Sequence, residues 1–142
     1  MNTVKQERSG WRDESISRRH REWGWDCPAI DIDFLLLNYS HGQPTALVEY
    51  KHEKVKSISP SHPSFKALIA LGTMAKLPVF CVRYSDNLVE YIVIPLNEIA
   101  STYVGGRTIM SELQWVSMLY RINKDRIPNH IKNKIVNRSA AT

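Results

Sequence analysis

Hydrophobic and polar positions alternate in the first third of the chain in a way that predicts a β-hairpin. Residues 29–38 (AIDIDFLLLN) alternate at first, with Asp31 and Asp33 on one face, and then become apolar throughout, which is typical of a strand buried on both faces. Residues 40–43 (SHGQ) are a turn signal, and residues 44–51 (PTALVEYK) predict a second strand. Two strands joined by so short a loop form an antiparallel hairpin.

The rest of the chain predicts further helices and strands around this hairpin. We expect helices at about 12–22, 63–76 and 110–122, and strands at 79–84 and 88–94. The second helix carries an apolar stripe made of Phe65, Leu68, Ile69, Leu71 and Met74. The order of elements predicts an α/β fold, with a central mixed β-sheet flanked by α-helices.

Length and composition favour one globular domain over residues 1–142, with ends (about 1–10 and 130–142) that we expect to be flexible. The hydrophobic share of 43% is that of an ordinary globular protein. No apolar run approaches the roughly 20 residues that cross a bilayer. The polar N-terminus lacks the apolar segment of a secretory signal, so we expect a cytoplasmic protein without a membrane partner. Cys27 and Cys81 have no metal-ligand spacing and are expected to be reduced, buried thiols.

The formal net charge of +5 permits a polyanionic partner. Basic residues gather near both ends of the chain, and those of the first helix directly precede the predicted hairpin. The candidate nucleic-acid contacts there are Arg18, Arg19, His20 and Arg21. Arginines at this place are suited to clamp phosphates. The alternative interpretation is a solvated basic helix.

Acidic side chains inside apolar strands are the feature that indicates chemistry. Asp and Glu are uncommon in strands and are seldom buried without partners. If the hairpin turn centres on His41, Glu49 faces Asp33 and Lys51 faces Asp31, with directly opposed Cβ atoms about 5 Å apart. Two carboxylates that close repel each other unless a proton or a cation lies between them.

A divalent cation would resolve that repulsion. Mg²⁺ takes oxygen ligands at ~2.1 Å and is usually held by one or two carboxylates with water and substrate phosphate. Asp33 and Glu49 are the predicted ligands, with the carbonyl oxygen of Tyr50 as a third and Asp31 as the second choice for the aspartate. Lys51 would orient or deprotonate the attacking water. The alternative is a structural salt bridge between Lys51 and Glu49 or Asp31.

The arrangement of Asp33 followed by Glu49-Tyr50-Lys51 resembles the PD-(D/E)XK nuclease superfamily, which includes restriction endonucleases, Holliday junction resolvases, RecB-like nucleases and many phage and mobile-element nucleases. The resemblance covers about residues 12–95 and implies a restriction-endonuclease-like core. By position, Asp33 matches the metal-binding Asp, Glu49 the second acid and Lys51 the lysine. No Pro precedes Asp33. Some relatives add a glutamate from the first helix, for which Glu22 and Glu14 are the candidates.

The resemblance implies a Mg²⁺- or Mn²⁺-dependent nuclease that hydrolyses phosphodiester bonds in DNA. The alternative is a catalytically silent nuclease-like module that binds nucleic acid or another protein. The sequence leaves open RNA as a substrate, the choice between endonuclease and exonuclease, and the substrate's structure or sequence. Cutting both strands of a duplex would favour a homodimer.

Overall fold

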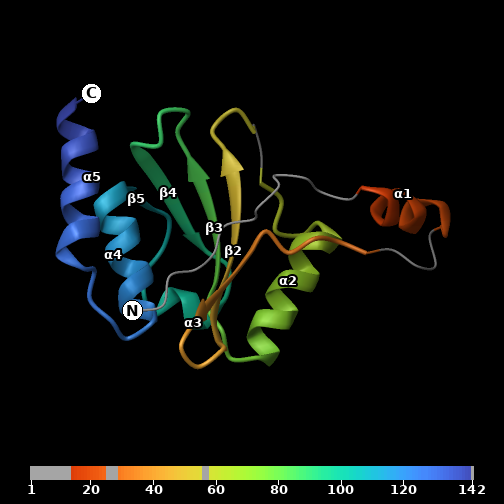
Figure 1. Cartoon of the computed structure of the whole chain (residues 1–142). Coiled ribbons are helices and arrows are strands. Elements are labelled where there is room, and N and C mark those ends of the chain that lie inside the picture. The colour runs from red at the N-terminus through yellow and green to blue at the C-terminus, as the bar shows by residue number, and fades with distance from the viewer. Residues whose placement is uncertain (1–13, 25–28, 56–57, 142) are drawn as a thin grey trace. The chain divides into compact units, whose positions relative to one another are not determined.

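The computed structural model of the chain describes residues 14–24, 29–55 and 58–141 (Figure 1). The chain divides into two compact units between Asp31 and Ile32. The first unit contains helix α1 (Ser15–Glu22), which matches the described part of the helix expected at 12–22. The expected flexible N-terminus lies outside the described residues. Among the described helices, none combines the length and apolar character needed to cross a membrane.

The second unit is a five-stranded sheet with helices on both faces. Its elements are β1 (Phe34–Asn38), β2 (Gln43–His52), α2 (Pro63–Met74), β3 (Val79–Tyr84), β4 (Glu90–Pro95), α3 (Glu98–Ser101), β5 (Thr108–Ser111), α4 (Glu112–Ile122) and α5 (Asn129–Ala141). The strands lie in the order β1-β2-β3-β4-β5, with β2 and β3 parallel and the other neighbours antiparallel. The predicted α/β class with a mixed sheet flanked by helices is therefore confirmed.

Alternate side chains of the central strands point to opposite faces of the sheet, and this alternation divides the core in two. On one face the strands pack against α4, and the buried side chains there include Ala46, Val48, Phe80, Val82, Val93, Trp115, Met118 and Ile122. On the other face Leu47 and Val79 pack against Leu68 of α2. Figure 1 shows α2 and α4 on opposite sides of the sheet. Burial of these apolar groups is the main force that holds the layers together.

The packing of α2 differs from the predicted stripe. Phe65 and Leu68 are buried, but Leu71 is 46% and Met74 is 81% exposed. A step of three residues falls about 60° short of a full helical turn, so the series drifts away from the sheet. Gly72 is the buried residue one turn after Leu68 instead.

The edge strand and the C-terminus also differ from the predictions. Residues 29–33 are not in a strand, and β1 is an edge strand with Phe34 52% and Leu35 50% exposed, so it is not buried on both faces. An edge strand has a neighbour on one side only. The expected flexible segment at 130–142 instead lies in α5 up to Ala141, where Ile135 is buried and Arg138 pairs with Glu112 at 3.3 Å.

Gly72 allows α2 to approach the sheet closely, and this contact can be tested. A Cβ at Gly72 would collide with the side chain of Val79 and lie 3.3 Å from the Leu77 carbonyl oxygen. We expect Gly72→Ala to destabilise the protein by about 1–3 kcal/mol in urea denaturation, although Ala favours helix more than Gly does. Gly105→Ala is the control, because nothing lies within 4 Å of the Cβ it would add. Equal stability of Gly72→Ala and the parent would contradict this packing.

Candidate functional site

The hairpin register brings the predicted acidic positions to the same place along the sheet. The paired positions before the register shift at Leu36/Leu37 are Phe34 with Val48, Leu35 with Leu47 and Leu36 with Ala46. This is the register expected from a turn centred on His41. Asp33 lies directly before β1, and one further step of the same register places its backbone opposite Glu49.

The carboxylate of Asp33 is bound to the backbone of β2. Its Oδ2 accepts a hydrogen bond of 3.2 Å from the backbone N–H of Tyr50. That N–H belongs to the peptide that joins Glu49 to Tyr50, so the two acidic residues are close in space. In an extended strand the N–H and C=O of one residue point to the same side, so the Tyr50 carbonyl also points toward the β1 edge.

Glu49 and Lys51 lie on the face of the sheet that α2 covers in part. Both share the strand face of Leu47, which packs against α2. Lys51 Nζ lies 3.2 Å from Glu49 Oε1, and the two side chains are 32% and 19% exposed, respectively. The Lys51 ammonium also lies 5.8 Å from the ring centroid of Phe65 in the first turn of α2. The salt bridge of the alternative interpretation is thus present between these two residues.

The environment of Glu49 disfavours its charged form despite that salt bridge. The pKa of Glu49 is raised above its usual value of 4.5, first because burial removes water from the carboxylate and further because of the charge of Asp33. The hydrogen bond and the charge of Lys51 act in the opposite direction. Since the net pKa shift is upward, burial and Asp33 together outweigh Lys51. The carboxylate is therefore only partly compensated by the protein.

The donor atoms at this place fit a hard cation. They are the carboxylates of Asp33 and Glu49 and the carbonyl oxygen of Tyr50, which are oxygen ligands of the kind that Mg²⁺ and Mn²⁺ take. Across the described ranges, no three His, Cys, Asp or Glu side chains gather closely enough to hold a metal ion. An ion held by Asp33 and Glu49 alone would complete its coordination shell with the backbone carbonyl of Tyr50, water and substrate oxygens, as Mg²⁺ commonly does.

Strand β3 adds a basic residue that the sequence analysis missed. In the parallel pairing of β2 and β3, Glu49 is matched with Cys81 and Lys51 with Arg83. Cys81 is a free, fully buried thiol, as expected, and its pKa is raised to about 11 by burial first and then by the charge of Glu49. The signal in the sequence was a single charged residue inside the apolar run VFCVRY, which is the same kind of anomaly as Glu49.

The remaining predicted site residues belong to the first unit and are described only within it. They are Asp31 and the α1 residues Arg18, Arg19, His20 and Arg21 with the accessory acids Glu14 and Glu22. Arg18 lies 3.2 Å from Glu14, and Arg19 lies 3.5 Å from Glu22. Both proposed accessory acids therefore have an arginine partner on their own helix. The position of these residues relative to Glu49 stays a prediction.

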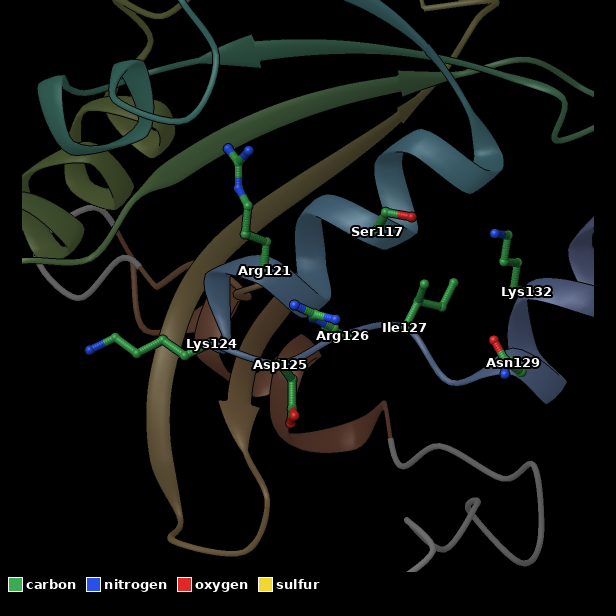
Figure 2. Close-up of a pocket in the computed structure, with 8 residues that line it drawn as sticks. All are labelled: Ser117, Arg121, Lys124, Asp125, Arg126, Ile127, Asn129 and Lys132. Atoms are coloured by element: carbon green, nitrogen blue, oxygen red, sulfur yellow. The ribbon is translucent and has the colours of Figure 1, made fainter.

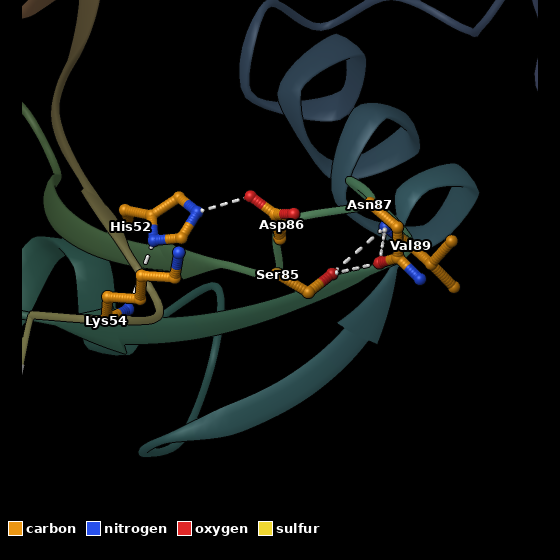
Figure 3. Close-up of polar contacts among 6 residues, drawn as sticks. All are labelled: His52, Lys54, Ser85, Asp86, Asn87 and Val89. Atoms are coloured by element: carbon orange, nitrogen blue, oxygen red, sulfur yellow. Dashed lines mark hydrogen bonds and ion pairs between the residues drawn. The ribbon is translucent and has the colours of Figure 1, made fainter.

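His52 at the end of β2 is held by two polar contacts (Figure 3). Its Nε2 lies 2.9 Å from Asp86 Oδ1, and its Nδ1 accepts a hydrogen bond of 3.1 Å from the backbone N–H of Lys54. An accepting Nδ1 leaves the ring proton on Nε2, where it is donated to Asp86. The Nε2 contact joins the end of β2 to the turn after β3, and the Nδ1 contact is local to the end of β2. Both ring nitrogens are thus engaged, and we assign no chemistry to His52.

A second candidate is a basic groove of about 820 Å³ beside α4 and the start of α5. Its lining residues are Ser117, Arg121, Lys124, Asp125, Arg126, Ile127, Asn129 and Lys132 (Figure 2). Figure 2 shows the Lys124 side chain extending away from Lys132 and Asn129, so the basic side chains do not converge on one point. The groove lies beside α4, which packs on the sheet face opposite Glu49.

Comparison of the chain with protein-family models, with curated proteins and with solved structures found no match. The candidate site is therefore defined by its own geometry, at Asp33, Glu49, Lys51 and Arg83. These four residues bring two carboxylates and two cations to neighbouring strands of one sheet.

The raised pKa of Glu49 gives a testable stability effect. Because the folded protein holds this proton more tightly than the unfolded chain, the free energy of unfolding falls as the pH rises from 4.5 through the folded-state pKa. We expect Glu49→Gln to be at least as stable as the parent at pH 7, with the difference vanishing below pH 4.5, in chemical denaturation at both pH values.

Glu112→Gln is the matched control for this prediction. Glu112 also pairs with a basic residue, Arg138, and its side chain is 22% exposed. It lies in the first turn of α4, where a negative charge is favourable, so its loss should cost about 0.3–1 kcal/mol at pH 7. If Glu49→Gln loses as much stability as Glu112→Gln, the Lys51 salt bridge dominates at Glu49 and the prediction is wrong.

Proposed function

We propose that this protein is a metal-dependent nuclease that hydrolyses phosphodiester bonds in DNA with Mg²⁺ or Mn²⁺. The observation that carries the proposal is the hydrogen bond from the Tyr50 N–H to Asp33 Oδ2, which holds one carboxylate beside the peptide of another. Lys51, two residues after Glu49, supplies a cation on the same face. This arrangement resembles the PD-(D/E)XK nucleases in the order and type of its residues.

The residues of the site have different proposed roles. Asp33, Glu49 and the Tyr50 carbonyl would hold the cation, which when bound lowers the pKa of a water and stabilises negative charge on the reacting phosphate. Lys51 Nζ is held by Glu49 and lies over the ring of Phe65, so its N–H donors are positioned to orient the attacking water. Its positive charge also offsets the charge that develops at the phosphate.

The alternative is a nuclease-like module that binds nucleic acid without cutting it. The paired acids favour the enzyme, because carboxylates beside a phosphate weaken binding unless a cation neutralises them. A purely structural salt bridge would need Glu49 and Lys51 alone. It does not account for the charge of Asp33, whose carboxylate accepts the Tyr50 N–H but also raises the pKa of Glu49 and so disfavours the ionised form of Glu49.

The central test replaces the proposed metal ligand Asp33 and the lysine Lys51 by residues chosen to keep the fold. Asp33→Asn keeps an oxygen that accepts the Tyr50 N–H but removes the negative charge, and Lys51→Ala removes the ammonium. We expect both variants to lose Mg²⁺- or Mn²⁺-dependent cleavage by at least about 100-fold on branched, single-stranded and duplex DNA, with an unchanged circular dichroism spectrum.

Asp31→Asn is the matched control, because it removes the same charge two residues earlier in the chain. It should leave cleavage near the parental rate if Asp33 is the main ligand. Parental cleavage rates in both Asp33→Asn and Lys51→Ala would refute the assignment. Salt-dependent DNA binding without any cleavage by the parent would instead favour the silent binding module.

The arginines of α1 give a second, independent test of the DNA partner. Replacing Arg18, Arg19 and Arg21 together by alanine should weaken DNA binding and reduce the slope of log affinity against log salt concentration, because fewer counterions are released. Fluorescence anisotropy at several salt concentrations measures both. Lys124→Ala, Lys132→Ala and Lys134→Ala combined remove the same net charge elsewhere. Equal slopes for the two triple variants would show that α1 has no special place in the footprint.

A further inference from the structure

Arg83 carries a buried hydrogen-bond donor without an acceptor. Its Nε is shielded from solvent and has no hydrogen-bond partner among the described residues. A buried N–H left unpaired costs free energy, and a guanidinium group satisfies its donors readily when an oxygen acceptor is near. The Arg83 side chain as a whole is only partly buried, so a rotation of the side chain can bring this donor to an oxygen acceptor that a ligand supplies.

The sheet fixes where this donor lies. Arg83 is paired with Lys51 across the parallel strands β2 and β3, which in sheets lie about 4.8 Å apart. It shares its strand face with Cys81, whose neighbour across the sheet is Glu49. The charges of Glu49, Lys51, Arg83 and Asp33 all contribute to the pKa of the Cys81 thiol, in keeping with the closeness that the strand register gives Glu49, Lys51 and Arg83.

We propose that Arg83 binds a non-bridging phosphate oxygen of the nucleic-acid backbone at this site, an inference that rests on the proposed function. A divalent cation would neutralise Asp33 and Glu49 and so leave the charges of Lys51 and Arg83 uncompensated. A phosphodiester supplies the missing negative charge, and its two free oxygens match the planar fork of a guanidinium. The Nε–H of Arg83 then gains the acceptor that it lacks in the free protein.

Binding without catalysis tests this assignment. Fluorescence anisotropy measures binding of a labelled single-stranded DNA with Ca²⁺ in place of Mg²⁺, because Ca²⁺ carries the same charge and also takes oxygen ligands but has a larger, less rigid coordination shell. We expect Arg83→Met to lower affinity by about tenfold and the salt slope by about 1, and Arg83→Lys to keep part of the affinity. Arg107→Met is the control, since it removes the same charge from an exposed loop position. Melting of Arg83→Met should occur at or above the parental temperature, because no hydrogen bond from Nε is lost.

Three results overturn the inference: parental affinity and salt slope in Arg83→Met, an equal loss in Arg107→Met, or no DNA binding by the parent. The proposed function is judged separately, by Mg²⁺-dependent cleavage in the parent. A parent that binds but does not cut, together with weakened binding by Arg83→Met, keeps the phosphate contact and removes the nuclease. A parent that cuts, together with an Arg83→Met variant that binds and cuts equally well, keeps the nuclease and removes the contact.

Discussion

Tyr50 is the residue through which the core determines the geometry of the candidate site. Its hydroxyl accepts a hydrogen bond of 3.0 Å from the indole N–H of the buried Trp115, and its ring packs edge-on against Phe34 at 5.2 Å between centroids. Because strand side chains alternate, a Tyr50 that faces the core forces Glu49 and Lys51 to the opposite face. Its backbone N–H holds Asp33, the neighbour of Phe34. The large core and the charged cluster are therefore positioned by the same stretch of β2.

The elements that the sequence predicts best are those whose pattern is set by local periodicity. The hairpin register and the strand at 79–84 agree with the structure because apolar runs and a short turn leave few alternatives. The exposure of β1 and the presence of the short strand β5 depend on which strands lie at the sheet edges. No local pattern contains that information. Helix α5 was missed because its sequence is polar and Ile135 is the apolar side chain that its described residues bury, so the apolar pattern is too sparse to predict a helix.

The candidate site was predictable to the same extent and for the same reason. Asp33, Glu49 and Lys51 stand out because charged residues interrupt apolar strands within one hairpin, whose pairing is local. Arg83 has the same signature, but its closeness to Lys51 follows from the parallel pairing of β2 and β3 across the α2 connection. Parallel neighbours are separated by a long crossover, so their register cannot be counted from a turn. The bond from Tyr50 to Asp33 likewise required the structure, because alternation alone does not distinguish Asp33 from Asp31.

The balance of charges at Glu49 favours the proposed metal site over a purely structural ion pair. Where a partner's charge outweighs the cost of burial, a salt bridge leaves its carboxylate easier to ionise. At Glu49 the result is the reverse, because burial and the charge of Asp33 exceed the contribution of Lys51. A closer Lys51 would favour the charged form of Glu49 alone. The repulsion between Asp33 and Glu49 involves both acids and would remain. A dense positive charge shared by both carboxylates lowers both costs at once, and a divalent cation coordinated by oxygen is the common species with that property.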